Sequence, residues 1–192
     1  MMEQMMKIRL ATPDDAESIL KIYAPFIRDT AITFETEVPS AEDFSRRIER
    51  VLERYPYLVS IVDGEIVGYA YASRLRERAA YEYSVELSVY ILPRYHGAGI
   101  ARKLYDCLFA LLREQGYVNS CAGYSEPNEK SARFHKKYGF TPVGTYHGVG
   151  YKFGRWVDVT WTERAIREPG DPPGEVRTVR ELPREFLDKV IC

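Results

Sequence analysis

The segment 85–102, which reads VELSVYILPRYHGAGIAR, constrains the fold of this chain most. An apolar strand pattern runs into a short loop with glycines at positions 97 and 99, and a helical pattern begins immediately afterwards. Such a junction directs backbone N–H groups and the positive end of a helix dipole toward one point, where a phosphate or pyrophosphate can bind. A tight strand-to-helix turn without a ligand is the alternative that this segment alone leaves open.

The remaining patterns alternate between helix and strand, with a DG hairpin signal at 63–64. Helices are expected over 13–28, 41–54, 100–115 and 128–138, and strands over 8–11, 57–62, 66–73, 81–91, 118–123, 143–149 and 156–162. From Glu168 onward the composition shifts to proline, glycine and charged residues. We therefore expect one folded domain over 1–164 and a Pro-rich tail over 165–192 that docks or stays loose.

The charge of the chain excludes several classes of partner. The 192 residues include 27 Lys+Arg and 28 Asp+Glu, whereas nucleic-acid binding usually needs a clear basic excess. No apolar run reaches the roughly 18 residues of a membrane span. The stretch 1–7 does not resemble a signal peptide, and the three cysteines lack metal-site spacing. We expect a cytoplasmic protein with reduced thiols, without nucleic-acid partner, membrane association or metal.

Two separated motifs carry a family resemblance. His96-x-x-Gly99-x-Ala101 resembles the coenzyme-A pyrophosphate loop Q/R-x-x-G-x-G/A of the GCN5-related N-acetyltransferase (GNAT) superfamily, although its first position departs from the pattern. Residues 128–140 resemble the second signature, N-x-x-A-x-x-x-Y-x-x-x-G-F, with histidine at the tyrosine position. The resemblance implies acetyl-CoA as co-substrate. It also implies an α/β (α+β) GNAT fold, with a mixed, mostly antiparallel central sheet splayed at a bulge and helices on both faces.

A closer similarity extends over residues 8–164. It covers TFETE at 33–37, RYPYLV at 54–59, GYAYA at 68–72, RxxYxxSVExSVY at 78–90 and GYKxGxWxDV at 150–159, all of which are similar to the phosphinothricin acetyltransferase branch. The branch implies N-acetylation of the α-amine of a small acidic amino-acid analogue, such as phosphinothricin, methionine sulfoximine or methionine sulfone. A narrower version of this function is detoxification of a herbicide, which would give herbicide resistance. Members of the branch are typically homodimers with the site near the interface, so a homodimer is expected.

The resemblance assigns two catalytic candidates. Glu86 corresponds to the proposed base of the branch, and its position in an otherwise apolar and aromatic strand fits that role. A solvated glutamate on an exposed strand face is the alternative. His135 stands where many superfamily members have the tyrosine that protonates the departing thiolate. It can equally hold the substrate, relay a proton, or be an inert helix histidine.

The cofactor and acceptor residues follow from the same resemblance. Backbone N–H groups of Val89, Tyr90 and Ile91 are expected to stabilise the oxyanion, and Asn128 to hydrogen-bond the pantetheine arm. The pyrophosphate is expected against Gly97, Ala98, Gly99, Ile100, Ala101 and Arg102. Substrate binding is assigned to Arg76, Arg78, Tyr81 and Phe34, since arginine suits bidentate binding of a carboxylate or phosphinate.

Two other functions stay open at this point. The first is acetylation of another amine, such as a polyamine or a protein N-terminus, which would favour an acidic or open cleft. The second is a non-catalytic acyl-CoA-binding sensor, which would favour loss of Glu86 and His135. Both residues are present.

Overall fold

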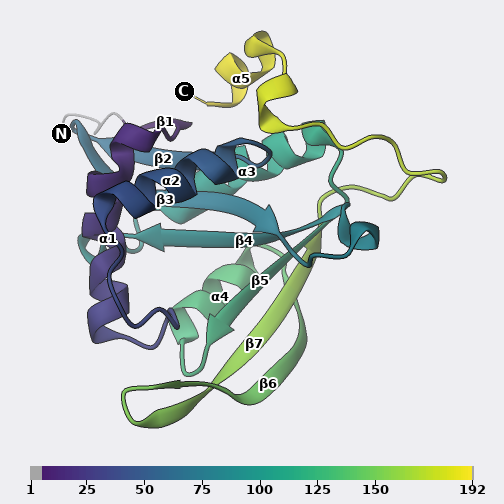
Figure 1. The fold of residues 1–192 in the computed structure, drawn as a ribbon. Helices are drawn as coiled ribbons and strands as arrows, with labels where there is room; N and C mark the ends of the chain where they lie inside the picture. Colours follow the sequence, from purple (N-terminus) through teal and green to yellow (C-terminus); the bar gives the residue numbers. More distant parts are fainter. Residues whose placement is uncertain (1–5, 192) are drawn as a thin grey trace.

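A seven-stranded sheet crosses the computed structural model, which describes residues 6–191 (Figure 1). The strands are β1 (Met6–Leu10), β2 (Tyr57–Val62), β3 (Glu65–Arg74), β4 (Ser84–Ile91), β5 (Asn119–Ser125), β6 (Thr141–Lys152) and β7 (Arg155–Ala165). Their order is β1-β2-β3-β4-β5-β7-β6, and within this sheet only β4 and β5 pair in parallel. The expected mixed, mostly antiparallel sheet is confirmed.

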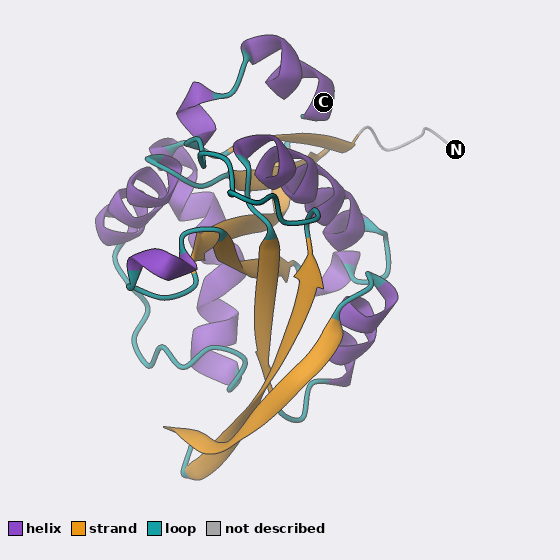
Figure 2. Ribbon diagram, turned by 90° about the vertical axis from the view of Figure 1, so that its right-hand side faces the viewer, coloured by secondary structure: helices purple, strands orange, loops and turns teal. Residues whose placement is uncertain are grey.

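Helices lie on both faces of the sheet, as expected (Figure 2). The α-helices are α1 (Ala16–Asp29), α2 (Ala41–Leu52), α3 (Ile100–Gln115), α4 (Glu129–Lys137) and α5 (Arg184–Val190). Short 3₁₀ turns are η1 (Pro13–Asp15), η2 (Ala79–Tyr81), η3 (Pro93–Tyr95) and η4 (Val179–Glu181). Among these, α1 and α2 cover one face, while α3 and α4 lie on the other.

Local sequence explains where the helices begin and end. The Ser40 hydroxyl accepts the N–H of Asp43 at 3.0 Å and so caps α2. Gly99 and Gly116 flank α3 with φ values of 80° and 100°, which glycine adopts without steric cost. The glycine pattern read from the sequence therefore marks both ends of this helix.

Each face of the sheet has its own core. On the α3 face, Leu104 and Leu108 are fully buried against the sheet. On the α1 and α2 face, tyrosine rings stack from strand to strand, and the Tyr57 and Tyr71 ring centroids lie 4.9 Å apart. Tyr69 stacks on Tyr90 in the same way, at 5.2 Å. Five of the 15 tyrosines of the chain belong to this second core: Tyr23, Tyr57, Tyr69, Tyr71 and Tyr90.

The sheet opens between β4 and β5. The two strands pair over only three positions, the last of them joining Glu86 to Cys121, and then diverge. The ladder between β3 and β4 keeps one register from Val85 to Ile91. The bulge that we expected in this part of β4 is therefore not seen as a register shift between β3 and β4. The sheet opens because β5 diverges from β4 after the pair Glu86–Cys121.

Strands β6 and β7 form a long hairpin arm that projects from the body of the protein (Figure 1). Its tip is attached to the α1–α2 connection by two contacts. The buried Lys152 donates from Nζ to the Thr33 carbonyl at 2.8 Å. The Phe34 ring lies so close to Gly150 that a Cβ there would approach it to 2.3 Å. The arm and the 30–39 loop therefore pack as one wall.

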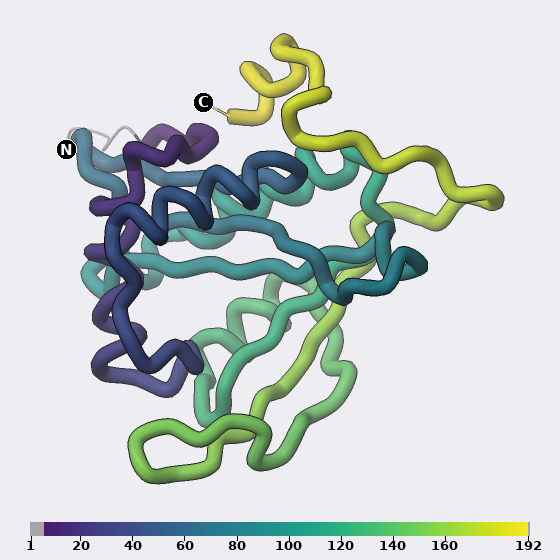
Figure 3. Tube along the Cα trace, in the orientation of Figure 1, coloured from purple at the N-terminus to yellow at the C-terminus, as the bar shows by residue number. Residues whose placement is uncertain are grey.

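The segment that follows β7 returns across the ends of α2 and α3 (Figure 3). Gln115 is fully buried, and its Nε2 donates to the carbonyls of Arg54 and Arg177, each at 2.8 Å. Val179 and Leu182 are buried in the α3-side core. Of the two states expected for the tail, the described part adopts the docked one and adds the short helix α5.

This packing predicts a large stability cost for a tail substitution. Leu182→Ala should lower the free energy of unfolding by about 2–5 kcal/mol, because it leaves a cavity in the core. Glu185→Ala, at an exposed position of the same segment, should change it by less than about 0.5 kcal/mol. Urea unfolding measures both values. Equal, small effects would show that the tail does not unfold with the core.

Candidate active site

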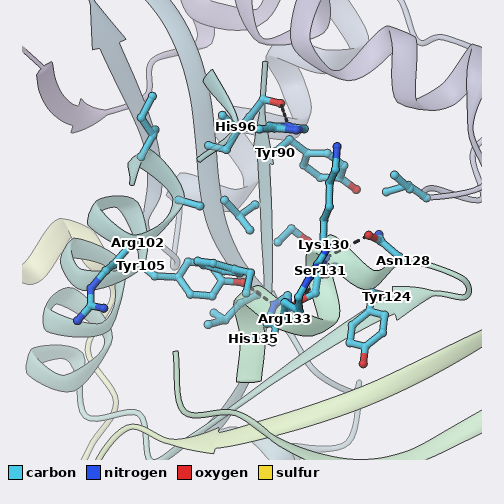
Figure 4. Close-up of a pocket in the computed structure, with 18 of the residues that line it drawn as sticks. Tyr90, His96, Arg102, Tyr105, Tyr124, Asn128, Lys130, Ser131, Arg133 and His135 are labelled. Atoms are coloured by element: carbon cyan, nitrogen blue, oxygen red, sulfur yellow. Dashed lines mark hydrogen bonds between the residues drawn. The ribbon is translucent and has the colours of Figure 1, made fainter. Parts of the chain in front are cut away.

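A cavity of about 630 Å³ occupies the opening between β4 and β5 (Figure 4). Its lining comes from α1 and the loop after it, the second half of β4, the loop before α3 and the start of that helix, the end of β5, and α4. Of the predicted cofactor residues, it includes Val89, Tyr90, Ile91, Gly97, Gly99, Ile100, Ala101, Arg102 and Asn128. Ala98 lies in the same loop but is not part of the lining.

The loop before α3 has the form of an anion site. Gly97 and Gly99 have φ values of 86° and 80°, and a Cβ on either would meet no atom within 4 Å, so the space in front of the backbone is open. The first helical bond runs from the Lys103 N–H to the Gly99 carbonyl, at 3.1 Å. The N–H groups of residues 100–102 precede it and are left for a ligand. The loop therefore fits a pyrophosphate.

His96, at the position where the sequence departs from the family pattern, bonds to the chain's own backbone. Its Nε2 lies 3.1 Å from the Ile91 carbonyl, and only a ring N–H can donate to a carbonyl oxygen. The ring thus ties the loop back to the end of β4 instead of offering this N–H to the anion. The anion site rests on backbone N–H groups and on the glycines.

Strand β4 offers further backbone donors to the cavity. Alternate residues of a strand direct their N–H groups to opposite sides, and β4 has no strand partner on the β5 side beyond Glu86. Val89, Tyr90 and Ile91 line the cavity in this unpaired part. Unpaired N–H groups beside a bound carbonyl are the elements of an oxyanion site.

Glu86 lies at the last paired position of β4, where the two strands begin to part. It points to the sheet face of α1 and α2, since it is in register with Ser73 on β3 and two residues from Ser88, which pairs with Tyr71. Burial raises the pKa of its carboxyl above the ordinary value, and the charge of Arg76 offsets part of this rise. The side chain borders the opening without forming part of the cavity lining.

His135 is buried in the cavity wall, with 4% of its surface exposed (Figure 4). Its Nδ1 lies 2.9 Å from the Ser131 carbonyl and must therefore carry the proton. In the neutral ring, Nε2 is then an acceptor, and the Tyr105 hydroxyl donates to it at 3.3 Å. Burial also lowers the pKa of the imidazole, which disfavours a second proton. In this geometry His135 has no proton to give at Nε2.

Sequence reasoning missed Tyr105 and Ser131, both of which line the cavity. Their spacing was a usable signal. Tyr105 lies four residues after Ala101 on α3, and Ser131 lies three after Asn128 and four before His135 on α4. Residues at these spacings share one helix face.

Asn128 begins α4 and caps it. Its Oδ1 accepts the Ser131 N–H at 3.1 Å, so the side-chain amide is held with one end on the helix. The Nδ2 group has donors left for a ligand in the cavity that it lines. This placement fits the expected contact with a pantetheine arm.

The four predicted acceptor residues lie outside the cavity lining. Arg76 extends across the face of β7, with its guanidinium carbon 5.5 Å from the Trp161 ring centroid. Phe34 packs against the arm and keeps 40% of its surface exposed. Arg78 precedes η2 and Tyr81 is its last residue, and both side chains are exposed in the β3–β4 connection. Of the four, Arg76 is the one whose charge acts on Glu86.

Within residues 6–191, no group of three His, Cys, Asp or Glu side chains is placed to hold a metal ion. Over the same residues, no helix has both the length and the apolar character needed to cross a bilayer.

Comparisons with known proteins agree with this geometry. The phosphinothricin N-acetyltransferase of Streptomyces viridochromogenes is 35% identical over 176 residues, which cover 92% of this chain and 96% of that protein. The L-methionine sulfoximine/L-methionine sulfone acetyltransferase of Salmonella typhimurium is 34% identical over 168 residues, covering 87% of this chain and 98% of that protein.

A solved structure supports the same relationship. The phosphinothricin acetyltransferase from Sinorhizobium meliloti, in complex with acetyl-CoA, matches with a TM-score of 0.82 at 29% identity, covering 92% of this chain and 99% of that one. The family model described as an acetyltransferase (GNAT) domain matches residues 8–161. The chain therefore belongs to the GNAT family of acetyltransferases.

Proposed function

We propose that this protein transfers the acetyl group of acetyl-CoA to the α-amine of a small acidic amino-acid analogue of the phosphinothricin, methionine sulfoximine or methionine sulfone type. The observation that carries the proposal is the arrangement of the cavity. The cavity is bordered by an anion site at 97–102. The half-buried carboxyl of Glu86 borders the same opening between β4 and β5, and the charge of Arg76 acts on it. The activities named for the two relatives are consistent with it.

The first step is removal of a proton from the acceptor ammonium. Because burial raises the pKa of Glu86, its carboxylate is a stronger base than an exposed glutamate. The free amine then attacks the thioester carbonyl from the side of α1 and α2, where Glu86 points. The Leu92 N–H bonds to the Val67 carbonyl on the β3 side, so by alternation the N–H groups of Val89 and Ile91 face the opening, and these two stabilise the oxyanion that forms.

In the second step the tetrahedral intermediate collapses: the C–S bond breaks, the thiolate leaves, and the proton still carried by the attacking nitrogen passes to the thiolate or to solvent. A thiol of pKa about 8.5 needs little help to leave. We assign His135 the role of holding the Tyr105 hydroxyl in the cavity wall, because its Nδ1 proton is bonded to Ser131 and its Nε2 is an acceptor. Direct protonation of the thiolate by this imidazole would require a second proton, which its burial disfavours.

Glu86→Gln should lower kcat by about 10²–10⁴-fold, the usual worth of a general base. Affinity for acetyl-CoA, measured by calorimetry, should be retained, because residue 86 lies outside the cavity lining. The matched control is Glu163→Gln, since Glu163 lies on the same sheet face in register with Cys121. Turnover is measured by free thiol release. Unchanged turnover in the Glu86 variant would remove it as the base.

A panel of amines tests the acceptor class. Phosphinothricin, methionine sulfoximine and methionine sulfone should react with higher kcat/KM than spermidine or a peptide N-terminus, because the unpaired Arg76 favours an anionic acceptor. Thiol release is again the readout. Faster reaction of polyamines or peptides, with the acidic analogues inert, would support the other amine class. No turnover with any amine, despite acetyl-CoA binding, would support a sensor.

We further propose that the protein forms a homodimer through the hairpin arm and works in the cytoplasm on small molecules, with detoxification of a herbicide as the narrower possibility. Large exposed apolar side chains gather on the arm, among them Val143, Tyr146, Val149, Tyr151, Phe153 and Trp156. A second copy of the chain would cover them. The cytoplasmic location follows from the thiol pattern of the sequence.

The dimer can be tested at its most exposed ring. Trp156 keeps 68% of its surface exposed, and Trp156→Glu should convert a dimer into a monomer in sedimentation velocity at micromolar concentration. Arg113→Glu, at an exposed site on α3, is the charge-change control and should stay dimeric. A wild-type protein that sediments as a monomer would contradict the proposal.

A further inference from the structure

Within residues 6–191, Arg76 has no acidic partner, in contrast to Arg74 two residues before it. Arg74 forms an ion pair with Glu77 at 3.0 Å, and Arg94 pairs with Glu65. Among the described residues, no carboxylate lies within ion-pair distance of Arg76, whose Nη1 donates to the carbonyl of the adjacent Leu75 at 2.8 Å. The remaining guanidinium N–H groups are available to an anion from solution.

An aromatic ring supports this unpaired guanidinium. The guanidinium carbon of Arg76 lies 5.5 Å from the centroid of the Trp161 ring. A cation over an indole face is attracted by the ring electrons, while the edge of the guanidinium stays open for bidentate hydrogen bonds. Stacking of this kind restricts a long side chain without using its donors.

The indole is itself fixed by the strand next to it. Trp161 on β7 pairs with Gly123 on β5, and a Cβ at Gly123 would lie 3.3 to 3.4 Å from three atoms of the ring. The ring therefore rests on the glycine backbone. Gly123 also lines the cavity. The supported guanidinium thus lies next to the cavity wall.

The same surface contains Glu86. It is in register with Cys121 on β5, two residues from Gly123, so Glu86, Gly123 and Trp161 point to one sheet face. The positive charge of Arg76 acts on both Glu86 and Cys121, which agrees with this placement. A base and an unpaired cation therefore meet at the place where β4 and β5 separate.

The chemistry of an α-amino acid fits such a pair. Its amine and its carboxylate are attached to one carbon, so an amine held at Glu86 brings the carboxylate to a neighbouring cation. The family resemblance already assigns Arg76 to the acceptor, and its unpaired guanidinium fits the α-carboxylate. We propose that Trp161 is the positioning residue that holds this guanidinium in place. The inference rests on the proposed function, because it requires an amino-acid acceptor.

The test separates the α-carboxylate from every other part of the acceptor. Methionine sulfone and its α-carboxamide differ only in that charge, and each is assayed by thiol release with the full-length protein. Trp161→Leu should raise KM for methionine sulfone by roughly tenfold, the scale of a charged hydrogen bond. The KM for the carboxamide, the KM for acetyl-CoA and kcat should each change by less than about twofold.

Two more variants keep the result interpretable if Trp161→Leu is poorly folded. Trp161→Phe keeps an aromatic face and should retain most of the selectivity for the carboxylate over the carboxamide. Arg76→Gln should raise KM for methionine sulfone at least as much as Trp161→Leu. The double variant should add little to it, since the two side chains act as one unit.

The outcomes distinguish a failure of the role of Trp161 from a failure of the proposed function. Equal KM changes for the acid and the carboxamide, or additive effects of the two substitutions, would show that Trp161 only packs, and would overturn the inference while leaving the function intact. A wild-type enzyme that acetylates neither methionine sulfone nor its carboxamide, yet turns over a polyamine, would overturn the proposed function itself and the inference with it.

Discussion

The separation of β4 and β5 after Glu86 is the constraint on which the rest of this structure depends. A parallel pair held by only three residue pairs leaves backbone groups of β4 without strand partners, and buried N–H groups need partners. The co-substrate proposed for this cavity would supply them. The helices on both faces keep the opening from closing, because α3 and α4 are packed on one side and α1 on the other.

Charge is distributed to match this geometry, although the chain is almost neutral as a whole. Several surface arginines are paired with a carboxylate of the chain, as Arg46 is with Glu42 and Asp43. The backbone N–H groups of the 97–102 loop and the guanidinium of Arg76 are left to attract small anions. Burial makes Glu86 a stronger base, while Arg76 limits how far its pKa rises, so the carboxyl can still ionise.

The sequence allowed the element order, the sheet class and the part of the cavity wall formed by β4 and the 97–102 loop to be predicted, because these depend on local patterns. Ser40, Gly99 and Gly116 mark helix ends by their own conformational preferences. The hydrogen-bond partners could not be predicted in the same way. The partners of His96 and His135 depend on the distance between a ring and a carbonyl, which no spacing rule gives. The support of Arg76 by Trp161 joins segments 85 residues apart and depends on a glycine in a third strand.

The hydrogen bond from Lys152 to the Thr33 carbonyl joins the hairpin arm to the 30–39 loop. The Tyr23 hydroxyl holds the Thr33 side chain at 2.7 Å, and Tyr23 packs edge to face on Tyr90 of β4, with ring centroids 5.0 Å apart. A continuous series of contacts therefore leads from the arm, through the 30–39 loop, to a strand of the cavity. The arm is therefore joined to the cavity wall through packed and hydrogen-bonded side chains, and Tyr90, which lines the cavity, is the last member of this series.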